Sequence, residues 1–250
     1  MIRVKKIQIP QLPTKDGRRL YVYLPRDYAG SEERYPVLYM FDGHNVFYDS
    51  HATYGKSWGM KAYLEKTKLP LILVAVECNT EGARRLNEYT PWTFSRRGLG
   101  TIEALGRATM DWFVDDLKPE IDRTYRTLPD RAHTLIAGSS MGGLMSLYAV
   151  VQYNAVFSRA AALSPSLWVD PKALAELIRS RDLRSPTSIY MDMGSGEVAG
   201  HRHALSGMFD VAKLLTKSGA DVAARVVPGA MHCEAAWEER IPVFFQYLLG

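Results

Sequence analysis

A serine set between closely spaced glycines is the part of this sequence best suited to chemistry. Residues 138–143 read Gly-Ser-Ser-Met-Gly-Gly and place Ser140 at the centre of a Gly-x-Ser-x-Gly pattern. An apolar segment at 134–137 precedes the pattern, and a segment rich in Leu, Met and Val follows it. This order of strand, turn and helix is typical of a nucleophile elbow, where small neighbours allow a sharp turn that exposes a hydroxyl. We therefore expect Ser140 to be a nucleophile, the alternative being a glycine-rich packing turn.

The same pattern occurs a second time at residues 55–59, which read Gly-Lys-Ser-Trp-Gly around Ser57. Short patterns of this kind arise by chance, so their context decides. Polar residues at 49–54 precede the second copy, where an elbow needs a buried strand. The sequence therefore predicts that Ser57 is the N-cap of a helix over 57–66 and has no catalytic role.

His232 is the histidine best placed to serve as a base for Ser140. A serine hydroxyl at neutral pH is a weak nucleophile and needs a base beside it. In folds built around such an elbow, the chain order is serine, then acid, then histidine. His232 ends a short loop, 228–232, between the last expected strand and the C-terminal helix, where an imidazole reaches the C-terminal edge of a sheet. The alternative is a solvated loop histidine. His133 enters the strand before the serine, which favours a structural role.

The acid that orients the imidazole should lie in a loop after a strand, between the serine and the histidine in sequence. Glu197 meets this description because it follows an expected strand at 188–193, whereas Asp192 lies within that strand. We prefer Glu197; Asp192, another acid or a water-assisted serine–histidine pair stay open. A metal site of Glu197, His201 and His203 is weakly indicated, because two-residue histidine spacing lacks further ligands. We expect no metal and no cofactor.

The developing oxyanion needs N–H donors, which we expect to be the backbone amides of His44 and Met141. Met141 directly follows the nucleophile, and His44 lies in a turn after an expected buried strand at 36–41. The His44 side chain would then have another role. The alternative is an ordinary turn that ends the strand, in which Asp42 caps nearby amides.

Strands and helices alternate along the chain as they do in α/β folds. Period-two patterns and apolar runs predict strands at 2–9, 19–24, 36–41, 69–76, 134–137, 160–163, 188–193 and 221–227. Helical spacing predicts helices at 57–66, 102–117, 141–152, 171–178, 203–217 and 234–249. We expect Pro119 to end the second helix, the first two strands to be edge strands, and residues 77–100 to form a polar loop. The result is a mostly parallel sheet with helices on both faces.

The composition is that of one ordinary globular domain spanning residues 1–250. Hydrophobic residues make up 47% of the chain. The 31 basic and 27 acidic residues give a net charge of +4, too small an excess to indicate a nucleic-acid surface. Cys78 and Cys233 are too few for a disulfide framework and are expected to be reduced. Because we find neither an apolar segment of membrane-spanning length nor a signal-peptide core, we expect a cytoplasmic protein without membrane contact.

Four motifs together make the chain resemble the α/β-hydrolase-fold esterase family that includes enterochelin esterases, S-formylglutathione hydrolases, feruloyl and acetylxylan esterases, and mycolyltransferases. They are residues 38–45, 138–143, 164–168 and 229–232, the last followed by Glu234 and Trp237. The resemblance implies an α/β-hydrolase fold and a serine esterase. In such families the nucleophile, the base, the acid and the two oxyanion amides correspond to Ser140, His232, Glu197, His44 and Met141.

The resemblance also implies a small-molecule ester as the substrate. Hydroxycinnamoyl or acetyl esters of small sugars come first, then siderophore esters, then thioesters such as S-formylglutathione. An acyltransferase, which uses an alcohol in place of water, and a noncatalytic binding protein on the same scaffold are the alternatives. The sequence does not predict an oligomeric state.

Aromatic residues near two strand ends are candidates for substrate contact. Ser166 and Trp168 follow the strand at 160–163, so we expect them to line the pocket. Trp92 lies in the loop at 77–100, which also carries several arginines, a mixture suited to aromatic or anionic substrates. The alternatives are a strand-ending turn with a packed tryptophan, and arginines that are merely solvated.

Overall fold

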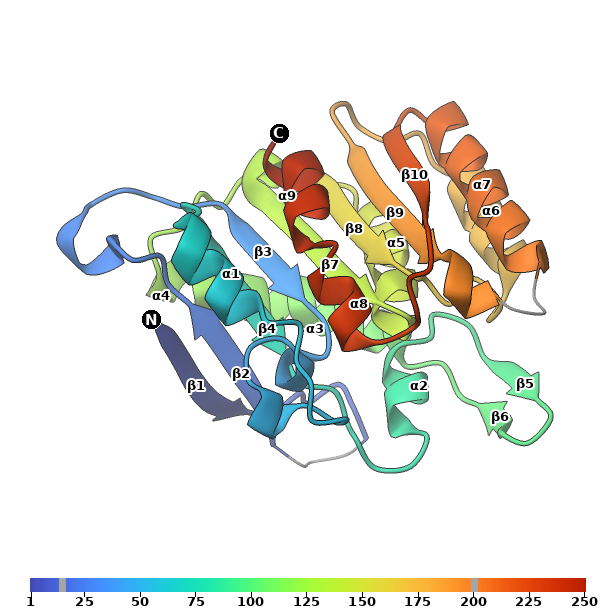
Figure 1. Ribbon diagram of the computed structural model, residues 1–250, viewed down its shortest axis with the longest axis horizontal. Helices are drawn as coiled ribbons and strands as arrows, with labels where there is room; N and C mark the ends of the chain where they lie inside the picture. Colours follow the sequence, from blue (N-terminus) through green and yellow to red (C-terminus); the bar gives the residue numbers. More distant parts are fainter. Residues whose placement is uncertain (14–16, 199–201) are drawn as a thin grey trace.

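An eight-stranded sheet forms the centre of the computed structural model, which describes residues 1–13, 17–198 and 202–250 (Figure 1). Its strand order is β1-β2-β4-β3-β7-β8-β9-β10. The strands are β1 (Ile2–Ile7), β2 (Arg18–Tyr23), β3 (Val37–Met40), β4 (Ile72–Val76), β7 (Thr134–Ser139), β8 (Arg159–Leu163), β9 (Ser188–Gly194) and β10 (Asp221–Val227). From β4 to β10 all neighbours are parallel, whereas β2 is antiparallel to both of its neighbours. The predicted mostly parallel sheet is confirmed.

The prediction that the first two strands are edge strands is wrong for β2. This strand pairs with β1 on one side and with β4 on the other, and five of its six residues are buried. The strand begins one residue earlier than expected, at Arg18, which is buried in an ion pair with Glu88, with 2.7 Å between Nη2 and Oε1. Polar groups that are paired can lie in an interior strand at a low cost in folding free energy. Hydrophobic patterning alone does not show such pairing.

Helices cover both faces of the sheet, as predicted. On one face lie α3 (Gly106–Trp112), α4 (Lys118–Thr124), α5 (Met141–Gln152), α6 (Pro171–Arg179) and α7 (Arg202–Lys217). On the other lie α1 (Met60–Thr67), α8 (Glu234–Glu238) and α9 (Ile241–Leu249), which Figure 1 shows in front of the sheet. Successive strand residues face opposite layers, so Tyr39 of β3 joins the first core while Leu38 and Met40 join the second.

Two predicted helices have different limits. α1 begins at Met60, after Gly59 in a left-handed conformation, and the Ser57 hydroxyl donates to Asp49 Oδ1 at 2.7 Å. Ser57 is therefore buried ahead of the helix and is not its N-cap. The helix expected at 234–249 is two helices, α8 and α9, because Pro242 lies in the first turn of α9 and starts a new helix there.

The segment between β4 and α5 also departs from prediction. Pro119 does not end a helix: α3 continues through a π-helical turn at Phe113–Leu117 into α4, where Pro119 lies in the first turn. The loop expected at 77–100 contains α2 (Arg84–Glu88) and β5 (Phe94–Arg96), which forms a hairpin with β6 (Gly100–Ile102). None of the helices in the described residues has the length and apolar character needed to cross a membrane.

Candidate active site

Ser140 lies at the sharp turn between β7 and α5. Its backbone has φ 57° and ψ −121°, a strained conformation for a residue with a side chain. The turn is so tight that a Cβ on Gly138 would lie 2.7 Å from the backbone of Gly142. The Ser140 N–H donates to the Leu163 carbonyl at 2.9 Å, which ties the turn to β8. The hydroxyl is partly exposed and lies 3.5 Å from Ser166 Oγ.

The backbone amides of His44 and Met141 have no protein acceptor among the described residues. Met141 begins α5, and the first N–H groups of a helix lack intrahelical partners. His44 lies in the 3-10 turn Gly43–Asn45 directly after β3. Its side chain has a separate partner, the Thr53 hydroxyl, 3.0 Å from Nε2. Burial lowers the pKa of the His44 imidazole, so the ring is neutral at pH 7.

Asp42, expected as a possible cap for nearby amides, is instead paired with Arg85 of α2. Its two carboxylate oxygens accept from the guanidinium at 2.7 and 2.8 Å. Burial raises the pKa of Asp42, but the Arg85 charge outweighs this effect and leaves the pKa below its usual value. Arg85 is therefore not one of the merely solvated arginines. The pair anchors the turn that carries the His44 amide.

One group of possible metal ligands occurs in the described part of the chain. Atoms of Asp42, His44 and Cys78 lie within 4.8 Å of one another. Both oxygens of Asp42 are engaged by Arg85, whose positive charge disfavours a cation at the same place. His201, weighed above as a metal ligand, lies outside the described residues.

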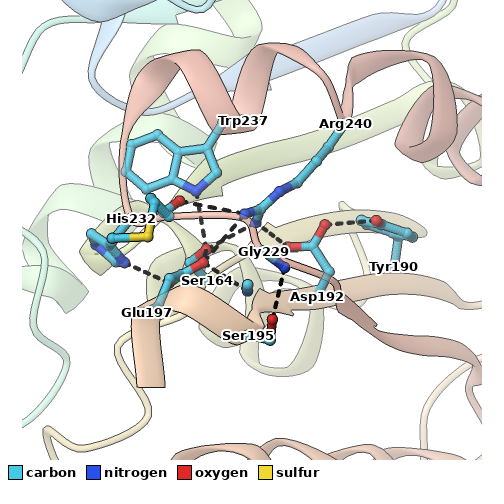
Figure 2. A network of polar contacts seen from close by, with 11 residues as sticks. Ser164, Tyr190, Asp192, Ser195, Glu197, Gly229, His232, Trp237 and Arg240 are labelled. Carbon is cyan, nitrogen blue, oxygen red and sulfur yellow. Dashed lines mark hydrogen bonds and ion pairs between the residues drawn. The ribbon is translucent and has the colours of Figure 1, made fainter. Parts of the chain in front are cut away.

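His232 and Glu197 form a direct hydrogen bond, with 2.7 Å between Nδ1 and Oε2 (Figure 2). Glu197 lies in a 3-10 turn, Ser195–Val198, directly after β9, and His232 follows β10. Because β9 and β10 are parallel neighbours, their carboxyl ends bring the two side chains to the same edge of the sheet. The acceptor is a carboxylate, so Nδ1 donates its proton, and in the neutral imidazole the lone pair is then on Nε2. The Glu197 side chain is 6% exposed and that of His232 is 45% exposed.

The second oxygen of Glu197 is held by a network of donors (Figure 2). Oε1 accepts from Ser164 Oγ and from the Gly194 N–H, each at 2.7 Å, and from Arg240 Nη2 at 3.3 Å. Ser164 Oγ in turn accepts from Trp237 Nε1 at 3.0 Å. These contacts leave the carboxylate little freedom to turn away from the imidazole.

Asp192, the alternative acid, is bonded elsewhere. It is fully buried, with Oδ1 2.8 Å from Arg240 Nη1 and Oδ2 accepting from the Tyr190 hydroxyl at 2.6 Å. In Figure 2 it lies on the far side of Arg240 from His232. The carboxylate that contacts the imidazole is therefore that of Glu197.

A series of contacts leads from His232 to the turn that lies beside Ser140. The His232 ring meets the Trp237 ring edge to face, with 5.1 Å between centroids. Trp237 bonds Ser164, which lies two residues before Ser166, the neighbour of the Ser140 hydroxyl. Across the described ranges no hydrogen bond joins Ser140 Oγ to His232 directly. Catalytic hydrogen bonds commonly tighten only when a substrate completes the site.

The Glu197→Gln variant should be destabilised most at neutral pH. Burial raises the pKa of Glu197, but hydrogen bonds from His232, Ser164 and the Gly194 N–H outweigh burial, so the pKa lies below its usual value of 4.5. The ionised carboxylate therefore stabilises the fold above that value, and this contribution is lost as the pH falls through the lowered folded-state pKa. We expect the variant to lose about 2 kcal/mol of unfolding free energy at pH 7.

Urea unfolding of both proteins at pH 7, 5 and 3.5 measures this loss. The difference between wild type and variant should shrink towards the lowest pH. A difference that stays constant across the three conditions would contradict the ionised state of Glu197.

The residues expected to contact substrate differ in their surroundings. Trp168 is 45% exposed; the Phe94 ring meets it edge to face at 5.6 Å, and the Arg96 guanidinium lies 4.1 Å from its ring centre. The β5–β6 hairpin thus folds over the turn that follows β8. Trp92 is half-buried and packs edge to face against Tyr148, with 5.9 Å between ring centroids. Trp168 is consequently the more accessible of the two tryptophans.

Arg240 is a residue of the site that was not predicted from sequence; its side chain is 3% exposed and bonds both Asp192 and Glu197. Its neighbours Glu238 and Glu239 suggest an exposed charged stretch, so no local signal marked it. Ser164 and Trp237 did belong to the motifs noted in the sequence, but spacing could not show that they bond each other. His133, expected to be structural, pairs with Asp130 near the protein surface.

The fold and these motifs define a class of protein. The family described as "Putative esterase" matches residues 13–248, and the chain belongs to this family of esterases. Among curated proteins, YbbA of Bacillus subtilis (strain 168) is 26% identical over 186 residues, which are 72% of this chain and 69% of YbbA. The endo-1,4-beta-xylanase/feruloyl esterase of Xylanibacter ruminicola is 26% identical over 194 residues, which are 72% of this chain and 25% of that protein.

Solved structures share the architecture. An IroE-like serine hydrolase from Shewanella oneidensis superposes with a TM-score of 0.79 at 22% identity, covering 99% of this chain and 79% of its own. At this identity the likeness concerns the fold, and the expected α/β-hydrolase fold is confirmed.

Proposed function

We propose that the protein is a serine ester hydrolase in which Ser140 is the nucleophile, His232 the general base and Glu197 the residue that orients the imidazole. The observation that carries the proposal is the 2.7 Å hydrogen bond between His232 Nδ1 and Glu197 Oε2, at the carboxyl end of the sheet that also carries the strained turn at Ser140. Because Nδ1 donates to the carboxylate, Nε2 is available to accept a proton.

The proposed reaction has two steps. His232 Nε2 takes the proton of Ser140 while the oxygen attacks the ester carbonyl, and the oxyanion forms against the amides of His44 and Met141. The imidazolium then gives its proton to the departing alcohol, which leaves an acyl-enzyme. Water, activated by the same imidazole, releases the acid and regenerates the serine. Ionised Glu197 stabilises the imidazolium at both steps.

The favoured substrate is a small sugar ester, with a hydroxycinnamoyl acyl group preferred to acetyl. The exposed ring of Trp168, with Phe94 at its edge and Arg96 over its face, supports an aromatic group near the serine. The 26% identity to a protein named for feruloyl esterase activity agrees with this substrate class.

An ester of an aromatic siderophore is a second candidate. The specific observation that favours it is the Arg96 guanidinium 4.1 Å from the centre of the exposed Trp168 ring, followed in the β5–β6 hairpin by the exposed Arg97. A guanidinium next to an exposed aromatic ring suits an anionic aromatic group such as a catecholate.

The test compares hydrolysis of a feruloyl sugar, the matching acetyl sugar and a 2,3-dihydroxybenzoyl-serine ester. We expect turnover with an acyl adduct on the Ser140 peptide, detected by mass after acid quenching. Trp168→Ala should raise KM for the feruloyl sugar about tenfold, the effect of losing one aromatic contact, and leave the acetyl sugar unchanged. The acetyl ester is the matched control because it differs only in the acyl group.

Each result points to a different conclusion. Faster turnover of the 2,3-dihydroxybenzoyl-serine ester than of the feruloyl sugar would select the siderophore candidate. Product formed only when an acceptor alcohol is present would indicate an acyltransferase. No turnover and no adduct with any ester would refute the proposal.

A further inference from the structure

Glu234 is a buried carboxylate close to the proposed site that the two-step reaction does not use. It is the first residue of α8, two positions after His232, and only 6% exposed. Its Oε1 accepts a hydrogen bond from Asn45 Nδ2 at 3.2 Å. Asn45 belongs to the turn after β3 that also contains His44. One side chain bond therefore joins the loop of the base to the turn of the oxyanion amide.

Asn45 is bonded through every polar group it has. Its N–H donates to the Asp42 carbonyl and its own carbonyl accepts from the Trp58 N–H, each at 2.8 Å. Its side-chain oxygen accepts from the Thr53 N–H at 2.9 Å, which leaves Nδ2 for Glu234. The position of this residue is thus set from several sides, and Glu234 provides the contact to the C-terminal loop.

The charges around Glu234 come from both sides of the site. Asp42, Arg85 and His232 all act on its carboxyl group. Burial, together with the Asp42 charge, raises the pKa of Glu234 above its usual value. An ionised group here therefore costs folding stability, and a neutral side chain that accepts the same bond would cost less. What the contact requires is an oxygen that accepts from Asn45 Nδ2.

We propose that Glu234 is a positioning residue that, through Asn45, holds the turn carrying the His44 amide in register with the loop carrying His232. This inference rests on the proposed roles of His232 and of that amide. Both loops end strands that lie far apart in the sheet, since β3 and β10 are separated by β7, β8 and β9. A direct bond between the two segments keeps the distance and orientation between the His232 imidazole and the His44 amide constant.

The test exchanges donor and acceptor. Asn45→Asp places two carboxylates against each other while keeping an oxygen for the Thr53 N–H. Because their repulsion displaces the turn with the His44 amide, this variant should lower kcat about 100-fold. Glu234→Gln keeps an accepting oxygen and should retain most activity. In the double variant Asn45→Asp, Glu234→Gln, the glutamine donates to the aspartate, so most of the lost kcat should return.

The control is Glu238→Gln, on the same helix. Glu238 is a partly exposed acid that pairs with Lys56, whereas the side chain of Asn45 bonds Thr53 and Glu234. This variant should keep wild-type kcat and KM. Circular dichroism and urea unfolding of every variant give the folded fraction against which kcat is expressed.

The affinity for phenylboronic acid distinguishes a positioning role from a purely structural one, because a loss of stability alone does not change the affinity of the folded protein. Its adduct with the serine carries an oxygen in the place of the oxyanion, so its affinity should fall together with kcat in Asn45→Asp while KM changes little. Lower stability with unchanged kcat for the folded protein would overturn the inference, and so would an Asn45→Asp defect that Glu234→Gln fails to rescue. Absence of turnover in the wild type would instead refute the proposed function and this inference with it.

Discussion

Replacing Ser140 with alanine should lower kcat for ester hydrolysis by about 10⁵-fold. The variant removes the oxygen that forms the acyl-enzyme and leaves the His232–Glu197 pair and the free amides in place. Those groups still polarise a bound ester, so a residual rate above that of uncatalysed hydrolysis should persist. Stopped assays with a large excess of variant enzyme, together with intact-mass analysis, measure both the residual rate and the missing adduct.

Ser139→Ala is the matched control for this experiment. Ser139 is the last residue of β7 and is 5% exposed, so its hydroxyl has no route to substrate. This variant should keep its turnover. Full activity in Ser140→Ala would refute the assignment of the nucleophile.

The backbone strain at Ser140 can be measured as a difference in stability between variants at this position. Glycine adopts φ 57° and ψ −121° without strain, whereas this conformation is strained for serine and alanine. Ser140→Gly should therefore have an unfolding free energy about 1 kcal/mol above that of Ser140→Ala, because relief of strain exceeds the added chain entropy of glycine. An inactive variant that gains stability would indicate that the strained turn serves the reaction rather than the fold.

Replacing Arg240 with methionine should lower the unfolding free energy by about 4 kcal/mol, the largest stability loss that we expect from a single change in this network. The guanidinium is 3% exposed and bonds Asp192 and Glu197, which are themselves almost fully buried. Removing it leaves two carboxylates out of water without a counter-charge. Urea unfolding at pH 7 measures the loss.

Two further variants distinguish lost charge pairing from lost packing. Asp192→Asn in the Arg240→Met background removes one of the uncompensated charges and should recover part of the stability. Lys56→Met breaks the exposed pair with Glu238 and should cost less than about 1 kcal/mol. Equal losses of unfolding free energy in Arg240→Met and Lys56→Met would contradict a larger contribution of the buried ion pairs to stability.

The two experiments are connected through Glu197. This residue bonds His232 with one oxygen and Arg240 with the other, so the same carboxylate belongs to the proposed site and to the buried network. Arg240→Met should therefore also weaken the orientation of the imidazole. The site is supported by side chains from β9, the α8–α9 junction and the turn after β8.

The predictable parts of the fold were those with strong local patterns. Helix α5 and strand β10 have the limits expected from sequence, since each is a long, regular segment bounded by clear breaks. Pro119 was misjudged because local patterning did not show the π-helical turn at Phe113–Leu117, through which α3 leads into α4 without a gap. The β5–β6 hairpin was missed because three-residue strands carry too few positions to show alternation.

The sequence by itself determined the order of strands and helices, the elbow around Ser140 and the place of His232 after the last strand, because these depend on contiguous residues and on chain order. Only the tertiary structure decided that Glu197, rather than Asp192, meets the imidazole, that Arg240 joins both carboxylates, and that Glu234 reaches Asn45. These contacts join residues 35 to 189 positions apart, or they select one of two carboxylates near the same strand end. Local spacing does not encode such pairs; they follow from which parallel strands lie side by side and from which buried charges find a partner.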